Sequence, residues 1–220
     1  VIQKSAFKLD AEEGDILCAE YNEVVSYLYK KMGVYSVNSR PNGSHIVPQS
    51  FLKICKDILS PEAGASVYIP FAGKGDYAFI MDGCSIDGTE ISPFNWAVSQ
   101  ILFDAFKVQG SIRLIKDADR SCDFNGKAKY IIAEPPVGDG RAELSRCFSL
   151  VSTITEKLED GGIACIVIPT GTLSSTNWKP LRSYMLDNIA DLSSLVMAMP
   201  PLYMPLTAVE LSLVVIRKQK

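Results

Sequence analysis

The first residues that could do chemistry lie in a glycine-containing turn within residues 67–76, which read VYIPFAGKGD. An apolar, β-branched and aromatic run ends at Pro70, and Gly73 and Gly75 follow before a helical run begins. A strand, a glycine turn and a helix in this order bring backbone N–H groups close to a ligand. The spacing matches neither the phosphate-cradling P-loop nor the three-glycine dinucleotide fingerprint. The turn alone therefore fits either a ligand-binding loop or an ordinary strand-to-helix corner.

Two acidic residues follow the next two predicted strands. Glu90 closes the run at 87–90, and a carboxylate one strand after a glycine turn can accept hydrogen bonds from both hydroxyls of a ribose. The alternative is a helix N-cap, but Ser92 is the better-placed N-cap. Asp117 follows the third strand and can accept a hydrogen bond from the exocyclic amine of an adenine ring. A solvated loop acid beside Lys116 is an equally good interpretation of Asp117.

A Glu-Pro-Pro-Val sequence ends the fourth predicted strand, as Glu134, Pro135, Pro136 and Val137. Two consecutive prolines fix the backbone and remove two N–H donors. Such a corner is rigid and rich in carbonyl groups, so it can hold hydrogen-bond acceptors toward an amine. A simple strand stop is the alternative, although a single proline would be enough for that.

The elements that must position these residues alternate between strand and helix from residue 66 onward. This alternation predicts an α/β fold with a doubly wound, mostly parallel seven-stranded sheet that is covered on both faces. Gly161-Gly162 is predicted to end the helix before the fifth strand. The predicted strands are 67–71, 85–89, 111–115, 130–133, 163–168, 192–197 and 209–217, and the other predicted helices begin near 75 or span 93–106 and 179–188.

Two further helices are predicted before the sheet, at 19–32 and 48–59, from apolar residues at helical spacing. We expect residues 1–60 to form a helical N-terminal extension that packs on the catalytic domain, and residues 61–220 to form one Rossmann-type domain. In parallel sheets, ligands bind beyond the carboxyl ends of the strands at the topological switch point. The glycine turn, the two acids and the double proline all follow strands, so we expect them to lie along one edge of the sheet.

Composition narrows the chemistry further. The chain has 220 residues, 47% of them hydrophobic and 21% charged, and no apolar run is long enough to span a bilayer. Six scattered cysteines and a single histidine, His45, make a zinc site or a histidine-based nucleophilic site a poor interpretation. The cysteine pattern favours a reduced, cytoplasmic protein. The net charge of −3 predicts that another domain or subunit makes most of the phosphate contacts to any nucleic-acid partner.

From about residue 20 to residue 217, the motifs and their order resemble the modification subunit of type I restriction–modification systems. Members of that family are adenine-N6 DNA methyltransferases that use S-adenosylmethionine. The stretch 69–75 resembles the cofactor motif Asp-Pro-Phe-x-Gly-x-Gly, and residues 45–48 resemble an upstream aromatic-Thr-Pro element. The stretch 134–137 resembles the catalytic Asn-Pro-Pro-aromatic motif.

The resemblance implies a methyltransferase-like Rossmann domain that binds S-adenosylmethionine and methylates DNA. DNA would be recognised through a separate specificity subunit or a missing domain, with other restriction–modification subunits as possible partners and no membrane contact. The implied catalytic residues are Glu134, Pro135, Pro136 and Val137. The implied cofactor-binding residues are Val47, Ile69, Phe71, Ala72, Gly73, Gly75, Glu90 and Asp117.

Four positions depart from the family pattern. Glu134 replaces the catalytic Asn, Val137 replaces the aromatic residue that stacks on the flipped base, Ile69 replaces an acid near the amino-acid end of the cofactor, and Val47 replaces a Thr. In the family, the Asn side chain and the first Pro carbonyl accept the two amine hydrogens of adenine, and the aromatic residue contributes ~1–3 kcal/mol of stacking. Two hypotheses follow: an active methyltransferase with a divergent site, or a non-catalytic methyltransferase-like binding or scaffold domain.

Overall fold

The computed structural model describes residues 47–81, 83–116, 123, 126–135, 149–153, 156–188, 195–199 and 208–218. The predicted helix at 19–32 lies outside these residues. The described helix α2 (Gln49–Leu59) begins after Pro48 and ends at Ser60 in the left-handed conformation. This agrees with the helix predicted at 48–59, where the proline carbonyl accepts the first helical hydrogen bonds, from Phe51 and Leu52.

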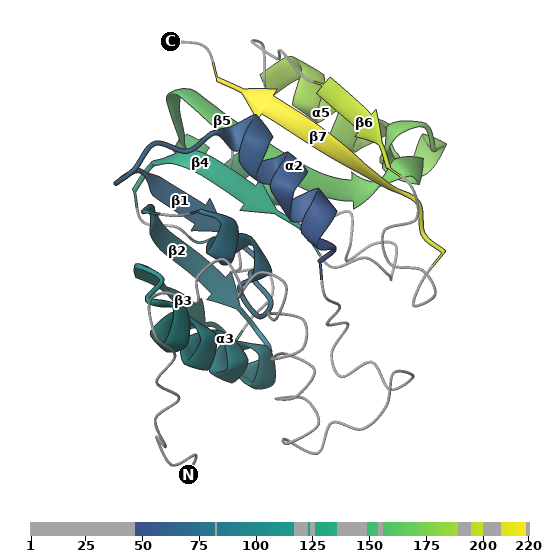
Figure 1. Cartoon of the computed structure of the whole chain (residues 1–220). Helices are drawn as coiled ribbons and strands as arrows, with labels where there is room; N and C mark the ends of the chain where they lie inside the picture. The colour runs from purple at the N-terminus through teal and green to yellow at the C-terminus, as the bar shows by residue number, and fades with distance from the viewer. Residues whose placement is uncertain are drawn as a thin grey trace.

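Seven strands form one sheet in the order β3-β2-β1-β4-β5-β7-β6 (Figure 1). All neighbouring pairs up to β5 are parallel, and β7 runs antiparallel to both β5 and β6. The predicted α/β, doubly wound and mostly parallel sheet is therefore confirmed. The strands are β1 (Ser66–Ile69), β2 (Ser85–Glu90), β3 (Gly110–Leu114), β4 (Ala128–Ala133), β5 (Leu158–Pro169), β6 (Leu195–Ala198) and β7 (Leu211–Arg217).

The central strands are buried on both faces, which explains why their sequences are almost continuously apolar. Val67, Tyr68 and Ile69 of β1 each have 0% of their surface exposed. Side chains alternate between the two faces along a strand, so they feed two separate apolar cores. One core holds Val67 and Ile69, and the other holds Tyr68.

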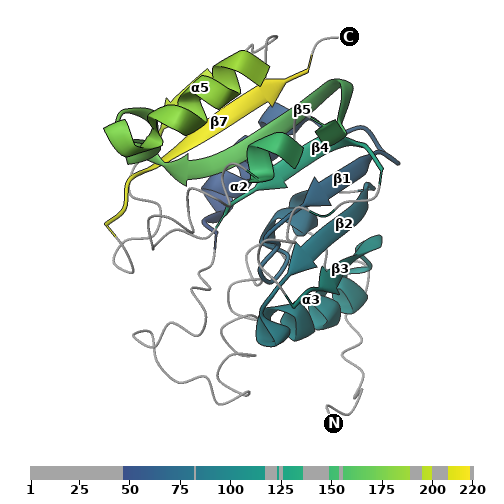
Figure 2. The same ribbon diagram turned by 180° about the vertical axis from the view of Figure 1, so that it is seen from behind.

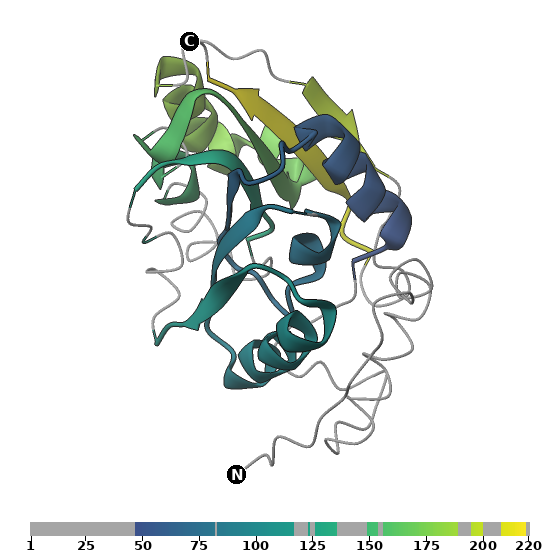
Figure 3. The same cartoon turned by 60° about the vertical axis from the view of Figure 1, so that its left-hand side comes forward.

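Helices cover the two faces unequally. Helix α2 packs four apolar side chains into the same core as Val67 of β1, together with the short 3₁₀ helix η2 (Asp76–Ile80) and Phe103 of α3 (Pro93–Phe106). Figure 1 shows α2 in front of the sheet, and Figure 2 shows α5 (Lys179–Asn188) in front of the opposite face. Figure 3 shows the twisted sheet between them. No helix in the described part of the chain combines the length and apolar character needed to cross a bilayer.

Two predicted elements differ from the structure. The helix expected near residue 75 is the five-residue 3₁₀ helix η2, which ends before Met81. Strand β5 begins at Leu158, so the prediction of a helix that ends at Gly161-Gly162 was wrong for this segment. Leu158 pairs with Ala128 of β4, and the register shifts between Ala128 and Tyr130. A glycine pair fits this irregular strand because a Cβ at Gly162 would lie 2.7 Å from the Lys129 carbonyl.

Candidate functional site

The turn after β1 carries three positive φ angles within five residues: 56° at Phe71, 58° at Gly73 and 92° at Gly75. A left-handed conformation is unusual for a bulky residue such as Phe71, and strained backbone of this kind gathers at functional sites. Phe71 is half-buried, and the next residue, Ala72, is buried and donates its N–H to the Thr89 carbonyl at 2.8 Å. The turn is thus tied to the end of β2.

The two glycines of the turn serve different purposes. A Cβ at Gly75 would lie 2.9 Å from Phe103 of α3 and 3.3 Å from Ile112 of β3, so this glycine allows close packing. A Cβ at Gly73 would meet nothing within 4 Å. The backbone at Gly73 therefore borders open space, which a ligand could approach without obstruction from neighbouring side chains.

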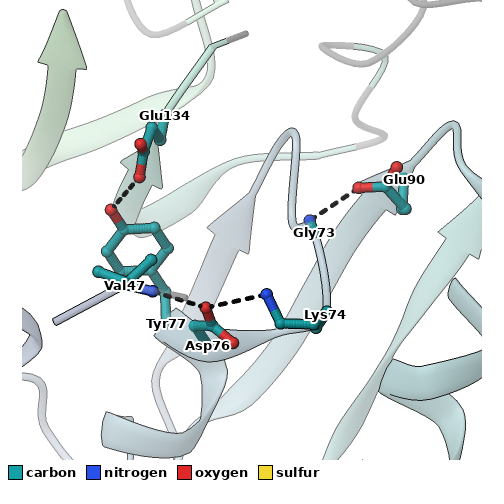
Figure 4. Close-up of polar contacts among 7 residues, drawn as sticks. All are labelled: Val47, Gly73, Lys74, Asp76, Tyr77, Glu90 and Glu134. Carbon is teal, nitrogen blue, oxygen red and sulfur yellow. Dashed lines mark hydrogen bonds and ion pairs between the residues drawn. The ribbon is translucent and has the colours of Figure 1, made fainter. Parts of the chain in front are cut away.

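Glu90 links the turn to the end of β2. One carboxylate oxygen accepts a hydrogen bond from the N–H of Gly73 at 2.7 Å (Figure 4). The other accepts from the N–H of Ser92 at 2.6 Å. The Ser92 hydroxyl accepts from the N–H of Asn95, which confirms that Ser92 is the N-cap of α3. Burial raises the pKa of Glu90 above its ordinary value of 4.5, while the N–H groups of Ser92 and Gly73 act in the opposite direction.

A buried ion pair lies inside the same turn and was not predicted from the sequence. The ammonium of Lys74 lies 3.5 Å from a carboxylate oxygen of Asp76, with side-chain exposures of 2% and 5%. The same oxygen accepts a hydrogen bond from the backbone N–H of Val47 at 3.1 Å. Asp76 thereby connects the start of α2 to the glycine turn. The sequence signal for this pair was two opposite charges flanking Gly75, in a turn otherwise made of small residues.

Glu134 follows β4 and is half-buried, and Pro135 after it is buried. The hydroxyl of Tyr77 in η2 donates to the Glu134 carboxylate at 2.6 Å (Figure 4). Burial raises the pKa of the Cys55 thiol, and the charges of Cys165 and Glu134 raise it further. Burial alone raises the pKa of Cys165 to about 12. Both thiols are therefore neutral at ordinary pH. Tyr77 was not predicted as a site residue.

The structure describes nine of the twelve predicted site residues, and their surroundings differ. Ile69, Val47 and Ala72 are buried within the core shared by α2 and η2. Ile69 thus extends the apolar core at the end of β1, where the family pattern has an acid. Gly73 lies in the turn, with Glu90 and Glu134 on opposite sides of it (Figure 4). Asp117, Pro136 and Val137 lie outside the described residues.

Two exposed apolar side chains stand beside Glu90, and they were also missed. Ile91 directly follows Glu90 and is 45% exposed, and Leu114 at the end of β3 is 42% exposed. Leu114 is the register partner of Glu90. Large exposed aliphatic residues next to a buried carboxylate form a surface that suits a flat apolar ring joined to a hydroxylated sugar. The only sequence signal was their position at strand ends.

At the carboxyl ends of the strands, Glu90 lies with the N–H of Gly73 on one side of the glycine turn. Glu134 lies with Pro135 on the other side. The first set can bind hydroxyl donors, and the second can accept hydrogens from an amine. Among the described residues, no group of three or more histidine, cysteine or acidic side chains could hold a metal ion. Cys55, Cys84 and Cys165 are buried thiols, and buried cysteines of this kind pack as small side chains.

Comparison with known proteins finds no matching protein-family model and no matching curated protein. Similar solved structures do exist. A candidate class I S-adenosylmethionine-dependent methyltransferase from Listeria monocytogenes has a TM-score of 0.71 at 11% identity, over 96% of this chain and 71% of that chain. A candidate rRNA-methylase from Clostridium thermocellum has a TM-score of 0.55 at 19% identity, over 77% of this chain and 96% of that chain.

A candidate methyltransferase from Streptococcus mutans, solved in complex with SAH (S-adenosylhomocysteine), has a TM-score of 0.53 at 14% identity. The match covers 76% of this chain and 97% of that chain. At these identities the likeness concerns the fold. The chain has the fold of the S-adenosylmethionine-dependent methyltransferases, with the candidate site at the carboxyl ends of β1, β2 and β4.

Proposed function

We propose that this chain binds S-adenosylmethionine at the glycine turn and transfers its methyl group to the N6 amine of adenine in DNA, as the modification component of a restriction–modification system. The observation that carries the proposal is the contact between Glu90 and the N–H of Gly73. Glu134 and Pro135 directly follow β4, the strand next to β1 in the sheet. The methyltransferase fold supports the cofactor part of this proposal, and the motif order supports the DNA-adenine part.

The residues present fit the nucleoside part of the cofactor. Glu90 has the acceptor oxygens that ribose hydroxyls require, and the open backbone at Gly73 allows close approach. Ile91 and Leu114 supply apolar surface for the adenine ring. When bound, S-adenosylmethionine supplies an electrophilic methyl group on a positively charged sulfur. Because the N–H groups of Gly73 and Ser92 already orient the Glu90 carboxylate, a bound ribose would meet a fixed acceptor, which lowers the ordering cost of binding.

The proposed acceptor end of the site is formed by Glu134 and the carbonyl of Pro135. An adenine amine is a poor nucleophile because its lone pair is delocalised into the ring. Two acceptors that bind its hydrogens draw the lone pair back onto the nitrogen. A carboxylate can also take the proton that the amine loses, which the Asn of the family pattern cannot do. The longer side chain of glutamate is compatible with this role only if it is held in place.

A second candidate function is a non-catalytic binding or scaffold domain. Two observations favour it: Ile69 is fully buried where the family has an acid, and the ion pair of Lys74 and Asp76 occupies the interior of the turn. Neither observation affects the contact between Glu90 and Gly73. The two candidate functions therefore share the same fold and differ in whether the chain transfers a methyl group.

Methyl transfer tests the proposal directly. The purified chain, alone and with a specificity subunit of a restriction–modification system, is incubated with tritiated S-adenosylmethionine and adenine-containing DNA, with RNA of the same sequence as a second arm. We expect label on adenine N6 in DNA, and a loss of about a hundredfold or more in Glu134→Gln. Glu156→Gln, an exposed carboxylate on the helical segment before β5, is the matched control. Label at background level in every arm favours the scaffold function. Label in RNA alone contradicts DNA as the methyl acceptor and favours RNA.

A further inference from the structure

We propose that Tyr77 is a positioning residue that holds the Glu134 carboxylate for its work on the substrate amine, and thereby compensates for the longer side chain of glutamate. This inference rests on the proposed function. Tyr77 and Glu134 are 57 positions apart in the sequence. They meet because η2 follows β1 and Glu134 follows β4, and these two strands are neighbours in the sheet.

The contact has the geometry of a strong hydrogen bond. The Tyr77 hydroxyl lies 2.6 Å from the Glu134 carboxylate oxygen, within the range of about 2.5–2.7 Å for a hydroxyl that donates to an ionised acceptor. Only 3% of the Tyr77 surface is exposed, and its ring lies in the core with Cys55 and Val47. The hydroxyl therefore sits on a ring that packing holds fixed. A partner anchored in this way limits where the carboxylate can lie.

Glutamate needs such an anchor more than asparagine does. Its side chain has one more rotatable bond, and ordering a long side chain costs up to about 2 kcal/mol of conformational entropy. A carboxylate offers about four lone-pair positions over its two oxygens. A bond from Tyr77 to one oxygen thus leaves the group capacity to bind an amine hydrogen. With the cofactor bound, the fixed carboxylate would receive the proton that the nitrogen loses when it takes the methyl group and the sulfur–carbon bond breaks.

The buried thiols near this pair add no negative charge beside the Glu134 carboxylate. Cys55 from α2 and Cys165 from β5 are both fully buried, and their raised pKa values keep both thiols protonated. Surroundings of low polarity strengthen a hydrogen bond to a charged group. In this contact the Tyr77 hydroxyl donates the hydrogen bond and the Glu134 carboxylate accepts it.

Tyr77→Phe tests the inference, because it removes only the hydroxyl. The matched control is Tyr130→Phe, which makes the same change at another buried tyrosine of the same core, on β4. The first readout is carbon-13 NMR of the full chain with labelled glutamate carboxyl groups, in which the signal lost in Glu134→Gln identifies Glu134. We expect the titration midpoint of this signal to move up by about one pH unit in Tyr77→Phe and to stay unchanged in Tyr130→Phe, because the lost hydrogen bond favoured the ionised form.

The second readout is methyl transfer to adenine-containing DNA. We expect kcat to fall about tenfold or more in Tyr77→Phe with the KM for S-adenosylmethionine unchanged, since the hydroxyl contacts the acceptor end of the site. The inference is overturned if the Glu134 titration midpoint does not move in Tyr77→Phe. It is also overturned if the midpoint moves but the kcat of Tyr77→Phe equals that of Tyr130→Phe. Absence of transfer by the wild-type chain contradicts the proposed function, and the NMR midpoint then shows whether the contact is a structural pair only.

Discussion

At the scale of single residues, Glu90 is the carboxylate whose ionisation has the clearest consequence. Its buried position raises its pKa, so a larger share of the group is protonated in mildly acidic solution than for an exposed glutamate. A protonated carboxyl offers fewer acceptor sites to ribose hydroxyls. Cofactor binding should therefore depend on pH on the acid side of neutrality.

We predict that affinity for S-adenosylhomocysteine is constant near pH 8 and declines as the pH falls toward the raised pKa of Glu90. Glu90→Gln should bind more weakly at every pH and lack this decline, because its amide does not titrate. Calorimetry at several pH values between 5 and 8 measures both. A decline that persists unchanged in Glu90→Gln would assign the pH dependence to another group.

The ion pair of Lys74 and Asp76 allows a stability prediction. Asp76→Ala removes one partner of a buried ammonium and an acceptor of the Val47 N–H. Because a buried charge loses a hydrogen-bonding partner, we expect the free energy of unfolding in urea to fall by about 2 kcal/mol. Asp104→Ala removes the acid of an exposed pair with Lys107 and should leave that free energy unchanged. Equal unfolding midpoints for the two variants would contradict a stabilising role for the buried pair.

At the scale of elements, the two glycines of the turn should respond differently to alanine. We expect Gly75→Ala to lower the free energy of unfolding by about 2 kcal/mol, from its left-handed backbone and the 2.9 Å approach to Phe103. Gly73→Ala has room for its Cβ and should cost about 1 kcal/mol. It should nevertheless weaken S-adenosylhomocysteine binding more than Gly75→Ala does at equal folded fraction, because the new methyl group enters the space proposed for the ligand.

Gly171→Ala is the control for both glycine variants. Gly171 is exposed, and a Cβ there meets nothing within 4 Å. Its unfolding midpoint and ligand affinity should match the wild type. If Gly73→Ala binds the ligand as well as Gly171→Ala does, the open space at Gly73 is not the binding site.

Much of the element layout followed from sequence because apolar runs and capping residues are local signals. Pro93–Phe106 and Lys179–Asn188 match the predicted helices, and the N-cap Ser92 marks the start of the first of them locally. The start of β5 did not follow, because Leu158 continues a helical pattern and becomes a strand only by pairing with Ala128, 30 positions earlier. Tertiary pairing outweighed local propensity at that point.

The candidate site was predictable to a similar extent. Glu90 and Glu134 were predicted because acids that follow parallel strands gather at one edge. Tyr77 was missed because η2 was expected to be an ordinary helix, with no reason to direct a phenol toward β4. Lys74 and Asp76 were missed because a pattern of charges in a turn indicates solvent exposure, whereas here both side chains are buried.

At the scale of the whole molecule, the charge balance bears on the proposed DNA substrate. Its net charge of −3 is unfavourable for a polyanion. We predict that the chain alone binds a 20-base-pair duplex weakly and without sequence preference in fluorescence anisotropy, and that affinity falls steeply with salt. A specificity subunit should supply the sequence preference. Tight, sequence-specific binding by the chain alone would contradict the need for such a partner.

The whole fold also sets how far likeness to other proteins reaches. The sheet order and the antiparallel β7 agree with a methyltransferase fold over nearly all of the chain. The site, however, combines Glu134, Tyr77 and the buried pair of Lys74 and Asp76. The fold alone does not fix what these side chains do, so cofactor binding and methyl transfer must both be measured on this chain.

The most direct test is a calorimetric titration of the purified chain with S-adenosylhomocysteine at pH 8. We predict saturable heat for the wild type at ligand concentrations up to millimolar, and a dissociation constant raised about tenfold or more in Glu90→Gln, because a hydrogen bond to a charged group is lost. Glu134→Gln, altered at the acceptor end, should bind as tightly as the wild type. No heat from folded wild-type protein at millimolar ligand, or equal affinity in Glu90→Gln, would contradict cofactor binding at the glycine turn.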